Sequence, residues 1–248
     1  MKYFLITFSA DRTVARIHMD LSSNGGAFDS DVAKEFKVLL GQLKKEKAFS
    51  LLHFTSGEKV FCSGGNLKKQ ALLKNSVDGL RGHLLIRKVL QGLAALSCVK
   101  VAWVQGDVFG GGLEILSCFD RVILAPQAIV GVWQRKMGLS WGWFGAARLV
   151  NRVFVSQLDF SMLSAETYSS YKAVHIGFAD EVCDPQFWGS KQNEFDERIS
   201  KLDPSTLKAQ RVASANGSIQ RSESKNFRSL WWKSPHLNAL NNFRKKMG

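Results

Sequence analysis

The sequence predicts an α/β fold, because short apolar strands alternate with helices through the first half of the chain. The order strand, loop, helix occurs at least twice there, which is typical of parallel sheets joined by right-handed crossovers. After about residue 143 the pattern becomes mostly helical, apart from a short stretch over residues 178–182. We therefore expect a core domain over residues 1–190 and a helical C-terminal region over residues 191–248.

The first elements are a hairpin and a helix. Residues 3–20 alternate apolar and polar side chains, which is typical of a β-hairpin. A loop rich in Ser, Asn and Gly follows over residues 21–27. Asp29 or Ser30 is suited to be the N-cap of a helix that extends to Leu43, since its apolar residues recur at helical spacing.

The next elements repeat one arrangement, in which a short apolar strand leads through a loop into a helix. Apolar residues at helical spacing predict one helix over residues 84–96. Another helix opens at a triple glycine and ends near Asp120. The predicted strands lie over residues 49–54, 100–104 and 121–125.

Composition excludes several classes of protein. With 248 residues, 45% of them hydrophobic and 22% charged, the chain can bury one sizeable core. No segment approaches the ~20 consecutive apolar residues of a membrane span, and the apolar N-terminus is too short for a secretory signal. We expect a cytoplasmic protein without a membrane partner.

The cysteines and histidines predict no metal site. Cys62, Cys98, Cys118 and Cys183 lie far apart in apolar surroundings, so free buried thiols are expected. Neither CxxC nor HExxH spacing occurs, which argues against zinc.

The net charge of +13 leaves three interpretations open. A basic chain of this size is often a nucleic-acid or membrane-surface binder, and a polyanionic cofactor would be attracted by the same field. The third interpretation is a solvated basic surface with no particular partner. Because the lysines and arginines are dispersed, nucleic acid is the least favoured partner.

Two glycine-rich loops carry the candidate chemistry, one over residues 61–67 and the other over residues 106–114. Three successive glycines at a helix start are costly, so close approach of a ligand to the backbone is a reasonable explanation. The unpaired amides of a helix N-terminus suit a developing negative charge. Glu114 projects from the same turn as Gly111, and a carboxylate beside such an amide can form an enolate.

Purely structural explanations of these loops stay open. A triple glycine can simply permit close packing of a helix on a strand, and a glutamate in a first turn complements the helix dipole. Dinucleotide binding would need GxGxxG, which does not occur, and P-loop chemistry would need Lys-Ser/Thr, which is also missing.

Taken together, the loops resemble the crotonase, or enoyl-CoA hydratase/isomerase, superfamily. Its patterns F-C-x-G-x-D-L and N-G-x-x-x-G-G-G-x-E correspond here to FCSGGNL over residues 61–67 and QGDVFGGGLE over residues 105–114. Weaker matches follow in the family's order, so that the resemblance covers almost the whole chain. They lie over residues 118–121, 137–149, 177–182 and 223–243.

The resemblance implies a spiral of repeated ββα units with a C-terminal helical region that closes the CoA site and forms trimers or hexamers. It implies that the amides of Gly65 and Gly111 bind the thioester oxygen and that Glu114 is the acid/base. No cofactor is implied beyond the coenzyme A of the substrate. Phe243 and Lys246 would reach CoA from a neighbouring subunit. The implied contacts to substrate or CoA are Gly26, Ala27, Phe28, Gly64, Leu67, Gly110, Phe243 and Lys246.

The chain departs from the family pattern at several positions. Gln134 replaces the second glutamate of the hydratases, and an amide cannot exchange a proton at neutral pH, although it can orient a water. Asn66 stands where Asp is common. Three tryptophans, Trp133, Trp141 and Trp143, are expected to crowd the acyl pocket unless they are ordinary core residues.

Three functions are carried forward. The leading hypothesis is an enzyme of the enoyl-CoA hydratase/isomerase type that uses Glu114 as acid/base. The alternative, motivated by Gln134, is a malonyl-type decarboxylase or double-bond isomerase on the same scaffold. A non-catalytic CoA- or RNA-binding protein, motivated by the net charge, is ranked last.

Overall fold

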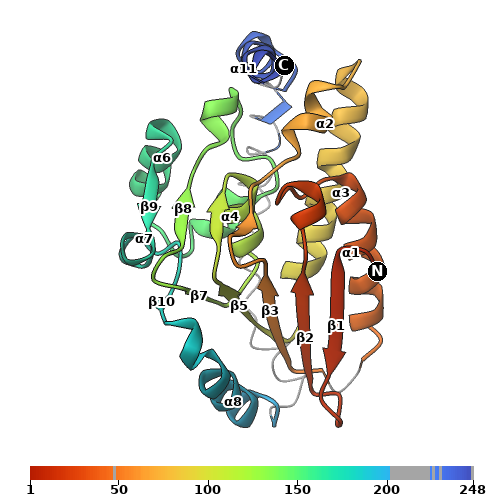
Figure 1. Cartoon of the computed structure of the whole chain (residues 1–248), viewed down its shortest axis with the longest axis vertical. Helices are drawn as coiled ribbons and strands as arrows, with labels where there is room; N and C mark the ends of the chain where they lie inside the picture. The colour runs from red at the N-terminus through yellow and green to blue at the C-terminus, as the bar shows by residue number, and fades with distance from the viewer. Residues whose placement is uncertain (47–48, 202–223, 225–226, 229–230, 247–248) are drawn as a thin grey trace.

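Two β-sheets and the helices packed on them form the protein, of which a computed structural model describes residues 1–46, 49–201, 224, 227–228 and 231–246 (Figure 1). The larger sheet has six strands in the order β1-β2-β3-β5-β7-β10, and the smaller has four in the order β4-β6-β8-β9. The strands are β1 Phe4–Phe8, β2 Val14–Met19, β3 Leu51–Ser56, β4 Val60–Cys62, β5 Val99–Val104, β6 Asp107–Phe109, β7 Arg121–Leu124, β8 Ile129–Gly131, β9 Thr167–Ser169 and β10 Glu181–Val182.

Helices connect and cover these strands. Short 3₁₀ helices occur at η1 Ser22–Asn24, η2 Gln134–Met137 and η3 Pro185–Phe187. The α-helices are α1 Ser30–Leu43, α2 Leu67–Ala71, α3 Ser76–Ala94, α4 Gly111–Leu116, α5 Gly145–Leu149, α6 Val155–Ser164, α7 Ser170–Ile176, α8 Trp188–Ile199 and α11 Ser234–Lys245.

A repeating unit links the two sheets. β3, β5 and β7 lie in the larger sheet, and each is followed by a short strand in the smaller sheet, β4, β6 and β8 respectively. Helices follow these short strands, which gives the predicted spiral of ββα turns. Neighbouring strands are parallel except for the β1–β2 hairpin and the β8–β9 pair.

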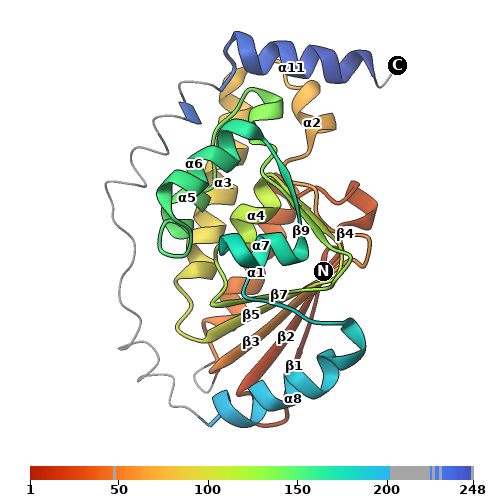
Figure 2. The same cartoon turned by 90° about the vertical axis from the view of Figure 1, so that its left-hand side faces the viewer.

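Both faces of the larger sheet are covered. Leu52, Phe54 and Ala102 point into the main core, which also contains the apolar faces of α1 and α3. Leu51 and Trp103 point to the opposite face, where they pack with Trp188, Phe195 and Ile199 of α8. Because side chains alternate along each strand, the larger sheet packs against helices on both of its faces (Figure 2).

The last described helix lies at one end of the molecule, beside α2 (Figures 1 and 2). Arg244 of α11 donates to the carbonyl oxygen of Ala71, at 2.5 Å from its Nε. Residues 202–223 lie outside the described part, so the proposed division at residue 190 stays a prediction.

Most predicted elements are confirmed, with shifts at their ends. Asp29 is the N-cap of α1, as expected, and accepts hydrogen bonds from the amides of Asp31 and Val32. The predicted helix from the triple glycine to Asp120 is shorter and ends at Leu116. Cys62, Cys98 and Cys118 are buried, whereas Cys183 is partly exposed.

Candidate functional site

The two glycine turns meet at one edge of the smaller sheet. β4 and β6 are parallel neighbours, so the turns that follow them lie side by side. A Cβ atom placed on Gly64 would lie 3.2 Å from the amide nitrogen of Gly111 and 3.1 Å from the carbonyl oxygen of Phe109. The sequence-predicted convergence of the two loops is therefore present in the structure.

Gly65 and Gly111 each contribute a main-chain amide to these turns. Within the described part of the chain, neither the Gly65 N–H nor the Gly111 N–H donates a hydrogen bond. Gly110, the N-cap of α4, has a φ of 52°, which favours glycine and sets the direction in which the helix leaves the turn. Both unpaired amides belong to residues that line one cavity.

This cavity, called the main cavity below, has a volume of about 260 Å³ and lies between the glycine turns and the segment that follows β8. Unpartnered polar atoms gather along it. Gln70 Oε1, Gln134 Oε1 and Ser140 Oγ are buried, and none has a hydrogen-bond partner among the described residues. Since buried polar atoms are normally satisfied, a polar ligand is a physical explanation for this cluster.

Glu114 is the only acidic residue among the described residues that line the main cavity. Its carboxylate is held by main-chain amides rather than by a cation. Trp143 N–H donates to Oε2 at 2.6 Å, Gly145 N–H to Oε2 at 2.9 Å and Gly142 N–H to Oε1 at 3.2 Å. Arg148 instead donates to the backbone oxygen of Glu114.

Burial raises the pKa of Glu114 above its ordinary value, although the amides of Gly145, Trp143 and Gly142 act in the opposite direction. The side chain is 2% exposed, so little water stabilises its charged form. A carboxyl group with a raised pKa keeps a protonated fraction closer to neutral pH, as a proton donor requires.

Gln134 lies beside Glu114 in the lining of the main cavity. Its Nε2 donates to Glu114 Oε1 at 3.4 Å, and its Oε1 has no partner. The residue that takes the place of a second acid thus contacts the first acid directly.

Comparisons with known proteins identify the family. The profile of the family described as enoyl-CoA hydratase/isomerase matches residues 9–225. The chain belongs to this family. The resemblance inferred from the two glycine loops is confirmed.

Two relatives show how similar the chain is to individual members of the family. An ethylmalonyl-CoA decarboxylase of Gallus gallus is 30% identical over 155 residues, which are 62% of this chain and 52% of that protein. A short-chain-enoyl-CoA hydratase of Clostridium acetobutylicum is 26% identical over 192 residues, 77% of this chain and 73% of that protein. This chain thus spans about half the length of the chicken relative.

The fold is that of solved family structures. The crystal structure of an enoyl-CoA hydratase from Bacillus halodurans superimposes with a TM-score of 0.87 at 17% sequence identity. The superposition covers 97% of this chain and 99% of that one. The α/β spiral with a helical C-terminal region is therefore confirmed, while identity this low carries no information on substrate.

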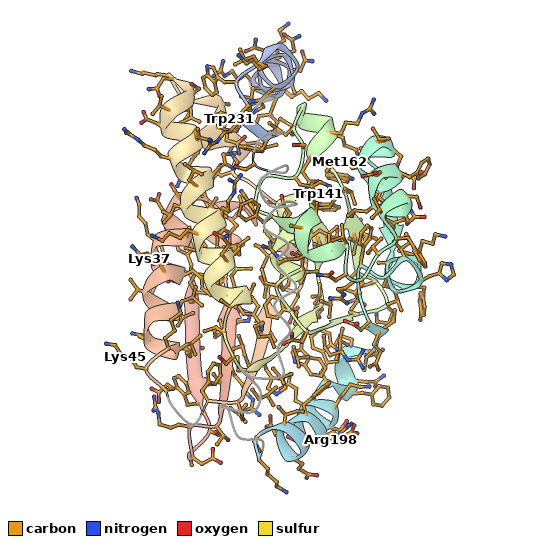
Figure 3. All side chains as sticks on the ribbon, turned by 180° about the vertical axis from the view of Figure 1, so that it is seen from behind. Lys37, Lys45, Trp141, Met162, Arg198 and Trp231 are labelled. Atoms are coloured by element: carbon orange, nitrogen blue, oxygen red, sulfur yellow. The ribbon has the colours of Figure 1, made fainter. Side chains whose placement is uncertain are left out.

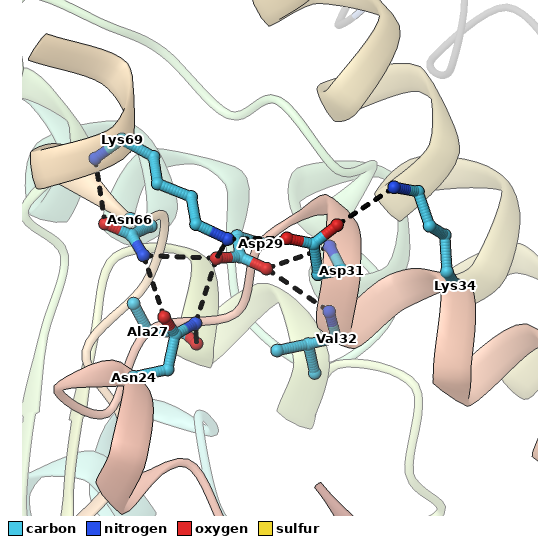
Figure 4. A network of polar contacts seen from close by, with 8 residues as sticks. All are labelled: Asn24, Ala27, Asp29, Asp31, Val32, Lys34, Asn66 and Lys69. Atoms are coloured by element: carbon cyan, nitrogen blue, oxygen red, sulfur yellow. Dashed lines mark hydrogen bonds and ion pairs between the residues drawn. The ribbon is translucent and has the colours of Figure 1, made fainter. Parts of the chain in front are cut away.

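A polar network attaches the first glycine turn to the loop before α1 (Figure 4). Asp29 is 6% exposed and accepts from Asn66 Nδ2 at 3.1 Å, from Asn24 Nδ2 at 3.0 Å and from Lys69 Nζ at 2.7 Å. Burial by itself raises the pKa of Asp29, but the bonds from Lys69, Asn24, Val32 and Asn66 outweigh it and hold the pKa below its ordinary value. An aspartate at position 66, as the family pattern has it, would face this carboxylate.

The residues expected to contact CoA occupy three places, namely the loop over residues 26–28, the main cavity and a separate groove. The loop over residues 26–28 runs along the first glycine turn, where Ser63 N–H donates to Gly26 O and Phe28 N–H donates to Gly64 O, both at 2.8 Å. The side chains of Ala27 and Phe28 are buried, so they are not exposed for contact with a ligand at the surface. Leu67, Gly64 and Gly110 line the main cavity.

Phe243 and Lys246 lie apart from that cavity, in a groove of about 500 Å³ between α11 and η2. They face residues of their own chain there, including Arg135. Lys136 and Met137 line both the groove and the main cavity, so the two spaces adjoin.

Sequence reasoning identified the glycines and the acid but missed several aromatic groups around them. His83 and Phe227 both line the main cavity. Trp231, labelled in Figure 3, packs against His83 with ring centroids 4.4 Å apart. The position of His83 on the buried face of α3 could have revealed it, because a histidine within an apolar stripe needs a partner. Of the three expected tryptophans, Trp133 and Trp143 line the cavity, while Trp141 does not.

Proposed function

We propose that the protein acts on an acyl-CoA thioester through an enolate. The amides of Gly65 and Gly111 donate hydrogen bonds to the thioester oxygen, and Glu114 transfers the proton. The observation that carries this proposal is the pair of unpartnered amides beside one buried acid in a single cavity. Amides fixed before the reaction stabilise an oxyanion at little cost in reorganisation.

Decarboxylation of a malonyl-type thioester is the reaction that this arrangement favours. The bond between Cα and the free carboxylate breaks, carbon dioxide leaves, and the electron pair forms the enolate held by the two amides. Glu114 then delivers its proton to Cα. One acid with a raised pKa suffices for this sequence, and the relatives named ethylmalonyl-CoA decarboxylase add support.

Hydration or isomerisation of an enoyl-CoA is the second candidate. The unpartnered Gln134 Oε1 could accept a hydrogen bond from a water molecule in the main cavity. Gln134 cannot itself remove a proton from that water, so Glu114 would serve both steps.

A substrate comparison tests the choice. We expect methylmalonyl-CoA and ethylmalonyl-CoA to lose carbon dioxide in the presence of the protein, as followed by mass spectrometry. Crotonyl-CoA, monitored by the absorbance of its conjugated thioester, is expected to react much more slowly. Rapid loss of that absorbance with unchanged malonyl-type thioesters would reverse the order of the two candidates.

The groove between α11 and η2 is the proposed site for the phosphates of CoA. Arg135, Lys136 and Lys246 line it, and it adjoins the main cavity at Lys136 and Met137. A cationic groove beside an apolar cavity suits a molecule with an anionic and an apolar end. Part of the net charge of +13 thereby gains a function.

A homotrimer is proposed for the assembled protein, as the family resemblance implies. Support comes from large apolar side chains exposed on and before α6, where Phe154 is 87%, Phe160 55% and Leu163 65% exposed. Phe160 and Leu163 are three residues apart on α6 and so share one face of the helix, and adjacent exposed apolar side chains are typical of interaction surfaces. A cytoplasmic location stays a prediction; among the described residues no helix is long and apolar enough to cross a membrane.

Light scattering after gel filtration checks the assembly. Wild type is expected to elute with the mass of three chains, and the double substitution Phe160→Glu, Leu163→Glu with that of one. Val38→Glu is the matched control, because Val38 is 59% exposed on α1. A wild-type monomer would contradict the proposal.

A further inference from the structure

Beside the main cavity lies a second, smaller one of about 90 Å³. The two cavities share the lining residues Gly65, Gln70, His83 and Trp143. These residues therefore form a wall between them, called the partition below. Beyond the partition, the apolar side chains of Leu73 and Ile86 line the smaller cavity together with the charged residues Asp29, Lys69 and Asp78.

The indole of Trp143 is the largest part of the partition. It lies across both glycines of the proposed oxyanion site. A Cβ atom added to Gly111 would fall 2.2 Å from Cζ3 of the ring, and one added to Gly65 would fall 4.0 Å from Cζ2. Its other neighbours include Phe28, with ring centroids 6.2 Å apart. The ring thus stands where an acyl chain leaving the thioester would continue.

His83 fixes the orientation of this indole. Trp143 Nε1 donates to His83 Nδ1 at 3.0 Å. Burial is the main cause that lowers the pKa of His83, to about 3, so the imidazole is neutral and Nδ1 can accept. Phe227 and Trp231 hold the imidazole in turn, with ring centroids 4.7 and 4.4 Å away.

We propose that Trp143, positioned by His83, limits the substrate to short acyl groups by closing the main cavity at the partition. The inference rests on the proposed function, since it assumes that the acyl group occupies the main cavity. The smaller cavity is then the space into which a longer chain would extend once the indole is removed. The main-chain amide of Trp143, which binds Glu114, is kept in any substitution of the side chain.

The test measures binding rather than turnover, by titration calorimetry with butyryl-CoA and octanoyl-CoA. Both thioesters are saturated and carry no free carboxylate, so they report affinity without reaction. Wild type is expected to prefer butyryl-CoA. Trp143→Ala is expected to bind octanoyl-CoA about ten-fold or more tightly than wild type does, since each newly buried methylene contributes about four-fold.

Four further variants separate this role from general damage to the fold. Trp141→Ala removes an equally buried tryptophan that does not line either cavity, and it should leave the chain-length preference unchanged. His83→Leu removes the acceptor for the indole and should raise octanoyl-CoA affinity by less than Trp143→Ala does. His83→Gln keeps an acceptor and should restore the wild-type preference. Trp143→Leu gives the same direction if the alanine variant does not fold.

The outcomes are distinguishable. If wild type binds butyryl-CoA but Trp143→Ala and Trp143→Leu keep its preference for the shorter thioester, the partition does not limit chain length, while the proposed function stands. If wild type binds octanoyl-CoA as tightly as butyryl-CoA, the inference also fails. If wild type binds no CoA thioester, both the inference and the proposed function fall.

Discussion

Replacing Glu114 with glutamine is expected to lower the turnover of the CoA thioester substrate by about 10²–10⁴-fold. Glutamine has the shape of the glutamate but has no proton to give in the reaction. Its Oε1 can still accept from Trp143 and Gly145, whereas its amino group would face the Gly142 N–H. A loss of about 1–3 kcal/mol in the free energy of unfolding follows, so circular dichroism should show a folded variant with a lower Tm.

The pH dependence of wild type identifies the direction of proton transfer. Burial raises the pKa of Glu114, and decarboxylation needs the protonated form to deliver a proton. The rate should therefore fall as the pH rises through this raised pKa. A reaction that begins with proton abstraction by the carboxylate would rise over the same range.

Glu58→Gln provides the control, because Glu58 is exposed between β3 and β4. It should keep both the rate and the pH profile of wild type. If Glu114→Gln retains full turnover, the acid of this mechanism lies elsewhere.

Gly112→Ala is expected to destabilise the protein by about 3 kcal/mol or more, because the site has no room for a methyl group. A Cβ atom on Gly112 would lie 2.5 Å from the carbonyl oxygen of Cys62 and 3.1 Å from Val108 Cγ1. The close contacts belong to β4 and β6, so α4 would have to move away from the smaller sheet. In guanidinium titrations the midpoint should fall with an unchanged slope.

Gly41→Ala is the matched control for this substitution. Gly41 is an exposed residue of α1, and a Cβ atom there would meet nothing within 4 Å. Alanine in an open helical position is expected to stabilise by about 0.5–1 kcal/mol. Equal unfolding midpoints for the two variants would contradict the close packing of α4 on β4.

The sequence predicted the longer elements well and the shortest ones poorly. The hairpin of β1 and β2 and the capped helix α1 carry local signals, namely alternation and an N-cap. β6 and β8 have three residues each, too few for a pattern, and they exist because neighbouring strands pair with them. Tertiary contacts decide such elements.

The residues of the candidate site also differ in whether the sequence predicts them. Gly65, Gly111 and Glu114 could be found because their motifs are contiguous in the chain. The contact of His83 with Trp143 joins residues sixty positions apart, and nothing in local sequence specifies such a contact. The main-chain amides that hold Glu114 could not be predicted from residue types, because every residue except proline has a main-chain N–H.

Because Trp143 holds Glu114 through its main-chain N–H, the placement of Glu114 does not depend on the side chain at position 143. Position 145 differs, since a Cβ atom on Gly145 would lie 2.4 Å from Glu114 Cγ. On the proposed mechanism, a change of side chain at position 143 would reshape the main cavity without disturbing proton delivery by Glu114. Substrate range and chemical step would then be separately variable, which makes the loop a suitable starting point for engineering new selectivity.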